Sequence, residues 1–67
     1  MTHADSPVDA RLRKVRHDLS NPLSAVLAET QLLLLNQEQF TAETLESLKQ
    51  IESLARRMRQ ILQDLTE

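Results

Sequence analysis

Aliphatic side chains recur along this chain at spacings of mostly three and four residues. Such spacing places them on one side of an α-helix, because successive helical residues are turned by about 100°. The polar segment 36–39 separates an early run of this pattern from a later one. The early positions are Val8, Leu12, Val15, Leu19, Leu23, Val26, Leu27, Leu33 and Leu34, and the later ones are Leu45, Leu48, Ile51, Leu54, Met58, Ile61 and Leu65. The pattern predicts two helices, each with an apolar stripe.

Residues with capping preferences mark the start of both predicted helices. Ser6 can cap the first, and Pro7 suits the first helical position, where a missing N–H does no harm. Thr41 can cap the second, with Glu43 near the positive end of the helix dipole. The expected segments are a disordered tail at 1–6 and a helical-hairpin domain at 7–67, made of a helix at about 7–36, a turn at about 37–41 and a helix at about 42–66.

Pro22 interrupts the first predicted helix. Proline removes the hydrogen bond from its own position to the Asp18 carbonyl and pushes on that carbonyl. One outcome is a bent but continuous helix. The other is a break, with Asn21 as the cap and Pro22 at the first position of a new helix. We favour the bend, because a helical apolar stripe resumes directly after the proline.

A chain of 67 residues buries little core, so disulfides, metals or a partner chain usually support it. The chain has no Cys, which excludes disulfides and thiolate metal sites, and no Gly, which excludes glycine-rich phosphate loops and Rossmann turns. Two helices cannot cover both apolar stripes, whereas a pair of hairpins can. We therefore predict an all-α fold, an antiparallel two-helix hairpin that dimerises into a four-helix bundle.

The overall charge and hydropathy narrow the class of protein. A net charge of −2 argues against nucleic-acid binding. No apolar run approaches the roughly 20 residues that span a bilayer. The first ten residues are polar and lack the apolar region of a signal peptide. A soluble, cytoplasmic module without a membrane segment is the expectation.

The charges are unevenly distributed along the two predicted helices. An antiparallel hairpin brings the cationic stretches to one end and leaves an acidic end opposite. The cations are Arg11, Arg13, Lys14, Arg16, Arg56, Arg57 and Arg59, and the acids are Glu29, Glu38, Glu43 and Glu46. For any single residue, a solvated helix surface is the simpler interpretation. The alternative is that one end attracts anions or an acidic partner.

His17 carries the side chain best suited to take part in a chemical reaction. On a helix it points about 160° away from the mean direction of the neighbouring apolar side chains, so it should face solvent. His17 has no second ligand residue beside it, which argues against a metal site. The remaining roles for His17 are an ordinary surface histidine or a nucleophile that takes a group from outside. Asp18 is the nearest carboxylate, although adjacent helical residues do not face each other. Asn21 and Arg13 lie one turn to either side, where they could bind phosphoryl oxygens.

The segment His17–Leu23, HDLSNPL, resembles the H-box of the dimerisation and histidine-phosphotransfer domain (DHp, HisKA type) of bacterial sensor histidine kinases. That pattern is His, then Glu or Asp, two variable residues, Thr or Asn, then Pro and Leu, and each position is met. The resemblance extends over nearly the whole chain, through the basic residues before the histidine, the polar turn and the Arg-rich and Leu-rich end of the second helix.

The resemblance implies roles for individual residues. His17 would be the phosphoacceptor, Asp18 the base that activates it, and Asn21 the residue that positions water when a phosphorylated partner is dephosphorylated. Pro22 would permit helix bending during switching. The resemblance also implies partner contacts just below the histidine on the first helix, at Ser24, Ala28 and Glu29, and at unassigned positions on the facing part of the second helix. Arg13, which could pair with phosphate, is a further partner-binding candidate.

The resemblance also implies partners. His17 would take a phosphoryl group and pass it to an aspartate on a response-regulator receiver domain. ATP and Mg would be bound by a separate kinase domain, in cis or in another chain, because a chain without Gly cannot close a phosphate-binding lid and should not phosphorylate itself. The alternatives are a stand-alone histidine phosphotransfer protein and a dimeric interaction module without chemistry.

Overall fold

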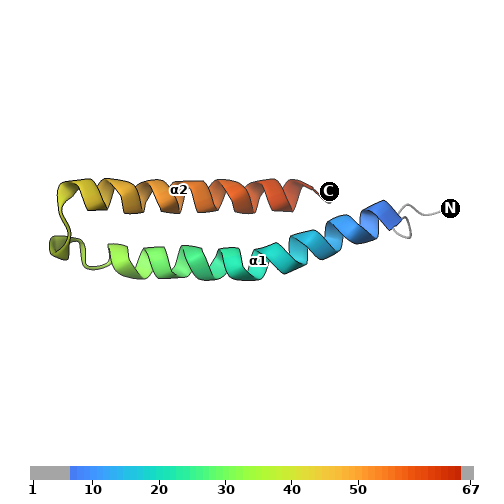
Figure 1. Ribbon diagram of the computed structural model, residues 1–67, viewed down its shortest axis with the longest axis horizontal. Helices are drawn as coiled ribbons and strands as arrows, with labels where there is room; N and C mark the ends of the chain where they lie inside the picture. Colours follow the sequence, from blue (N-terminus) through green and yellow to red (C-terminus); the bar gives the residue numbers. More distant parts are fainter. Residues whose placement is uncertain (1–6, 66–67) are drawn as a thin grey trace.

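The computed structural model describes residues 7–65 (Figure 1). Helix α1 spans Pro7–Leu34, a 3-10 turn η2 spans Gln37–Gln39, and helix α2 spans Ala42–Asp64. The two long helices lie side by side and run antiparallel, with η2 in the loop that joins them. No strand occurs in this part of the chain. The predicted all-α, two-helix hairpin is confirmed, whereas the tail at 1–6 and the Ser6 cap lie outside the described residues.

The loop between the helices begins earlier than expected. The Leu35 N–H donates to the Leu32 carbonyl and the Asn36 N–H donates to the Leu33 carbonyl, both at 3.2 Å. These bonds reach back three residues rather than four, so the last turn of α1 tightens and the helix ends at Leu34 instead of Asn36. At the other side of the loop, extended Thr41 caps α2 as expected, since its Oγ1 accepts the Thr44 N–H at 3.1 Å.

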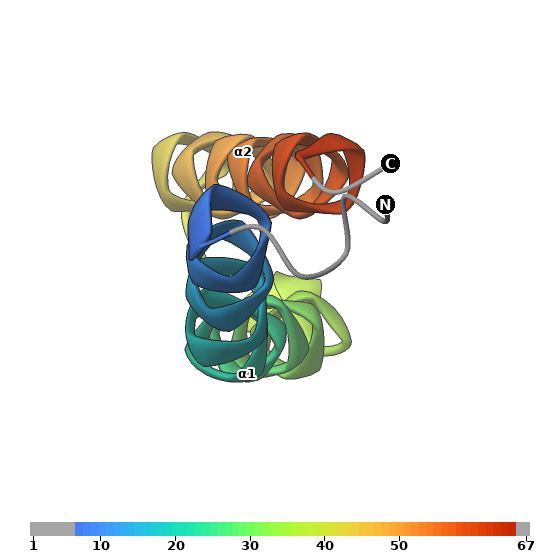
Figure 2. The same ribbon diagram turned by 90° about the vertical axis from the view of Figure 1, so that its right-hand side faces the viewer.

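Pro22 lies inside a continuous α1. Figure 1 shows the N-terminal part of α1, drawn in blue and cyan, inclined to its green part. In the end-on view of Figure 2 the blue part rises towards the level of α2. The missing hydrogen bond and the steric pressure of the proline ring account for such a change of direction. Of the two outcomes weighed for Pro22, the structure has the bend.

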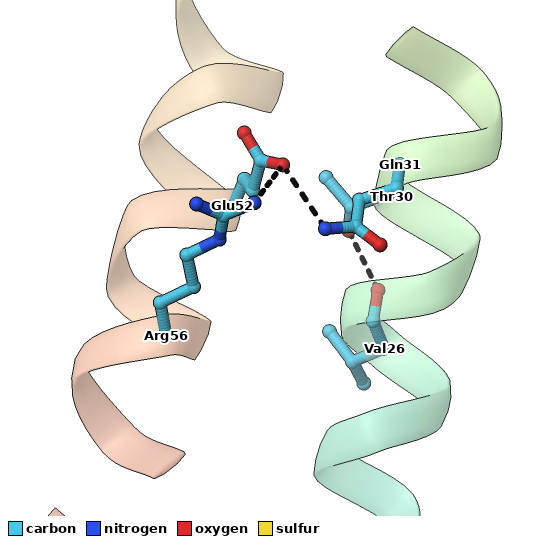
Figure 3. A network of polar contacts seen from close by, with 5 residues as sticks. All are labelled: Val26, Thr30, Gln31, Glu52 and Arg56. Atoms are coloured by element: carbon cyan, nitrogen blue, oxygen red, sulfur yellow. Dashed lines mark hydrogen bonds and ion pairs between the residues drawn. The ribbon is translucent and has the colours of Figure 1, made fainter. Parts of the chain in front are cut away.

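The interface between the helices is narrow. Among the described residues the buried side chains are Leu27 and Thr30 on α1 and Ala55 and Leu62 on α2. Thr30 satisfies its hydroxyl by donating from Oγ1 to the Val26 carbonyl at 2.7 Å, so the interface contains a polar residue without an unpaired donor (Figure 3).

A polar contact also crosses between the helices. The Gln31 amide on α1 donates from Nε2 to Glu52 Oε2 on α2 at 3.3 Å. Figure 3 shows these two side chains pointing towards each other, with Arg56 reaching the same carboxylate from α2. This contact shows the register of the two helices, with position 31 of α1 opposite position 52 of α2.

Much of the apolar surface stays open in the single hairpin. The exposed large apolar side chains of the described residues are Val8, Val15, Leu19, Val26, Leu32, Leu33, Leu35, Ile51, Leu54, Met58, Ile61 and Leu65. An open apolar groove runs between the helices near Pro22, lined by Leu19, Pro22, Leu23, Val26, Met58, Ile61 and Leu62. We call this side of the hairpin the apolar face. In residues 7–65, neither helix has the length and hydropathy needed to cross a membrane.

Candidate functional site

His17 stands on α1 just before the proline bend, and its side chain is 78% exposed. Leu19, which lines the apolar groove, is two residues later, so helical geometry turns it about 160° away from His17. The histidine therefore occupies the side of α1 opposite the groove, as its position relative to the apolar stripe predicted. A molecule from outside can approach the imidazole without displacing any part of the hairpin core.

Asp18 lies beside the imidazole. Its Oδ1 is 3.5 Å from His17 Nδ1, so the rotamers bring together two adjacent residues that helical geometry alone would point apart. The other oxygen, Oδ2, accepts a hydrogen bond from Lys14 Nζ at 2.9 Å. The Lys14 hydrogen bond, followed by the contact with His17, holds the pKa of the Asp18 carboxyl below its ordinary value. Asp18 is therefore a carboxylate at neutral pH.

Lys14 is the member of this cluster that sequence reasoning did not single out. In the sequence it reads only as one cation of a basic stretch. The available signal was its spacing, because a lysine four residues before an aspartate lies one helical turn away on the same side. Lys14 gives the carboxylate a second partner and so fixes its orientation towards the imidazole.

The arrangement favours different roles for the two ring nitrogens of His17. The carboxylate of Asp18 faces Nδ1, which favours the neutral tautomer that carries its proton there. Nε2 then keeps its lone pair and can act as a nucleophile on an electrophile from outside. Tautomers are set by such hydrogen-bond partners, so this assignment follows from the Asp18 contact.

The other candidate residues are displayed along α1 rather than gathered around His17. Asn21 lies one turn after the histidine and is exposed, as are Ser24 and Ala28 further along the helix. Arg13, one turn before it, and Glu29 are exposed as well. Pro22 differs from these because it lines the apolar groove. The structure thus brings Asp18 to His17, whereas the remaining candidates lie exposed at other positions along α1.

The described residues contain no cluster that resembles a metal site. No three His, Cys, Asp or Glu side chains come together between residues 7 and 65 in a way that could hold a metal ion. The carboxylate nearest to His17 is bonded to Lys14 instead. The groups that the structure brings together here are the His17 imidazole, the Asp18 carboxylate and the Lys14 ammonium group.

Comparisons with known proteins agree with this geometry. The family HisKA, described as the His Kinase A (phospho-acceptor) domain, matches residues 10–67. No curated protein and no solved structure gives a significant match. The family match covers most of the chain and includes the whole His17 segment. With an exposed histidine on the first helix of an antiparallel hairpin and this match, the chain belongs to the His Kinase A (phospho-acceptor) domain family.

Proposed function

We propose that this domain takes a phosphoryl group on Nε2 of His17 and passes it to an aspartate on a response-regulator receiver domain. Domains of this family act as phosphoacceptor and dimerisation domains of histidine kinases. The observation that carries the assignment to this residue is the exposed imidazole whose Nδ1 lies 3.5 Å from the Asp18 carboxylate. The reaction takes place in the cytoplasm, where ATP and receiver domains are available.

In the first step, the Nε2 lone pair attacks the γ-phosphorus of ATP that a separate kinase domain holds with Mg. The N–P bond forms as the P–O bond to ADP breaks. The ring gains positive charge, which the Asp18 carboxylate stabilises from the Nδ1 side. Because its pKa is lowered, Asp18 is a weak base, and we assign it to orienting the ring and stabilising this charge more than to removing the proton.

In the second step, a carboxylate oxygen of the receiver aspartate attacks the phosphorus. The O–P bond forms, the N–P bond breaks, and the electron pair returns to Nε2. In this proposal Asn21, one turn from His17, holds a water when the phosphorylated partner is hydrolysed instead. The partner-binding positions that we propose on α1 are Arg13, Ser24, Ala28 and Glu29.

The working unit that we propose is a homodimer in which two hairpins form a four-helix bundle. The exposed apolar side chains support this proposal, because a patch of this kind on a small domain marks a protein interface. The groove beside Pro22 offers the surface for a second copy, and bending at Pro22 would change its shape during switching. His17 stays outside that interface, on the opposite side of α1.

The test uses labelled ATP, the ATP-binding domain of a histidine kinase and this chain. We expect an acid-labile label that is absent from His17→Ala and retained by His3→Ala, the matched control for loss of the chain's other histidine. Label that survives His17→Ala would rule out this assignment. If the chain is instead a dimeric interaction module without chemistry, the wild-type chain and both variants should remain unlabelled, and His17→Ala should bind its partners normally.

A further inference from the structure

Glu52 on α2 accepts hydrogen bonds from two sides. Its Oε2 accepts from Gln31 Nε2 across the hairpin at 3.3 Å and from Arg56 Nη2 one turn along α2 at 3.2 Å (Figure 3). The Glu52 side chain is 24% exposed, whereas that of Arg56 is 56% exposed. Arginine carries five N–H donors in a rigid fork, so the bond to Glu52 leaves further donors for another acid. The structure therefore holds an arginine in place while most of it faces outward.

This arginine lies on the His17 side of the hairpin. His17, Ser24 and Gln31 are spaced by seven residues, about two turns, so they lie close to one line along α1 apart from the bend at Pro22. The helices are antiparallel, so one turn from Glu52 to Arg56 corresponds to about one turn from Gln31 back towards His17. Arg59 is three residues further along α2, on the same side as Arg56. Both arginines thus flank the exposed part of α1 that follows His17.

The charges of the hairpin are polarised along its length. The part that includes His17, residues 7–24 and 52–64, carries seven cations and four acids, whereas residues 25–51 carry one cation and four acids. Charges of one sign along a binding surface attract an oppositely charged partner and steer its approach. The partner that fits the His17 end therefore presents carboxylates.

We propose that Arg56 and Arg59 bind carboxylate side chains on the docking surface of the receiver domain and thereby select the partner that receives phosphoryl from His17. The inference rests on the proposed function and adds to it two specificity-determining residues on α2 and the chemistry that they recognise. Gln31 and Glu52 are positioning residues in this scheme, because Gln31 binds Glu52 and Glu52 holds Arg56 on the His17 side of the hairpin.

The test compares Arg56→Glu with Arg57→Glu. Both variants reverse one charge on the same turn of α2, but Arg57 is exposed on a different side, turned about 160° from Arg59. Purified receiver domains are first screened for binding to the unphosphorylated chain and for label transfer from the phosphorylated chain. With the best receiver, we expect Arg56→Glu to weaken binding and to lower kcat/KM of transfer about tenfold or more, since close interfacial charge pairs are coupled by at least about 1.5 kcal/mol. Arg57→Glu should change both less than about threefold.

Three further measurements separate docking from other roles. Replacing the contacting receiver carboxylate by lysine should restore transfer from Arg56→Glu, which loss of hairpin stability cannot explain. Added NaCl should slow transfer from the wild-type chain more than from Arg56→Glu. Label uptake on His17 from the kinase domain should be equal in both variants, and thermal unfolding should show that both are folded.

The outcomes distinguish this inference from the proposed function. Equal effects of Arg56→Glu and Arg57→Glu on receiver binding would overturn the carboxylate site, while normal labelling of His17 would leave the phosphotransfer role intact. A fall in label uptake from ATP, with transfer unchanged, would assign the arginines to the nucleotide step and also overturn it. Absence of label on wild-type His17 would reject the proposed function, and the binding comparison would still decide the inference.

Discussion

The hairpin has two exposed faces, the apolar face and the polar face that carries His17, and they have opposite requirements for contact with solvent. The apolar face exposes about half of Val26, Met58 and Ile61, although the neighbour of Val26 in sequence, Leu27, is only 5% exposed. The polar face carries His17 and the contacts between Gln31, Glu52 and Arg56. The apolar face is stabilised when it is covered, because removing apolar area from water is favourable. The phosphoryl exchange that we propose for the polar face requires that His17 stay open to solvent.

This difference shows how one pair of helices can serve assembly and chemistry together. Residues about two positions apart on a helix, such as His17 and Leu19, point to nearly opposite sides. A second copy can therefore cover Leu19 without shielding the imidazole. Each of the following substitutions alters one face and tests whether the other responds.

A charge on the apolar face should have the largest effect. We expect Val26→Glu to raise the dissociation constant of the proposed dimer by about a hundredfold to several thousandfold, because an uncompensated buried charge costs about 3–5 kcal/mol. Sedimentation equilibrium measures this constant. Leu35→Glu is the matched control, since Leu35 is 81% exposed and lies outside the groove. A dimer that tolerates Val26→Glu as well as Leu35→Glu would mean that the groove is not the interface.

A substitution on the polar face should slow label uptake on His17 and leave the proposed dimer unaltered. We expect Asp18→Asn to lower the rate of label uptake on His17 by about 10²-fold, since the amide cannot stabilise positive charge on the ring. Initial labelling rates with a purified kinase domain give the value. Asp9→Asn, about two and a half turns earlier on α1, is the control and should label at a normal rate. Equal rates for the two variants would show that Asp18 does not assist the transfer.

Removal of the Lys14 contact should have the smallest effect. The pKa of Asp18 is lowered in the folded chain, so the stabilising contact is present above its ordinary pKa and is lost as pH falls through the lowered value. We expect Lys14→Gln to raise the pKa of Asp18 towards its ordinary value, with the dimer unchanged. Carboxyl NMR titration measures the shift, and Lys49→Gln should leave it unaltered. An Asp18 pKa that is insensitive to Lys14 would contradict the hydrogen bond as its main cause.

The sequence predicted the two helices and the loop because the residues that specify each of them lie close together in the chain. Apolar spacing, the Thr41 cap and the polar segment 36–39 each act over a few residues, so they predicted two helices and a polar loop. The position of His17 relative to the apolar stripe predicted its exposure for the same reason. Lys14 could have been predicted too, since its contact with Asp18 stays within one helical turn.

The contacts between helices could not be predicted in the same way. Spacing gives a stripe, but the rotation of each helix decides which members of the stripe face the other helix. That rotation buries Leu27 and Thr30 and leaves Val26 open. Gln31 and Glu52 are 21 residues apart, and each reads from sequence as an ordinary exposed helix residue. Their pairing depends on the register of the two helices.

The sequence alone determined the helical periodicity, the proline within the first helix and a histidine directed away from the apolar stripe. These properties follow from backbone geometry and side-chain chemistry over a few residues. The tertiary structure decided that Pro22 bends α1 without breaking it, that the buried interface is narrow, and that Gln31 on α1 meets Glu52 on α2. Those outcomes depend on how two helices pack, which is a balance over the whole hairpin rather than a property of any short segment.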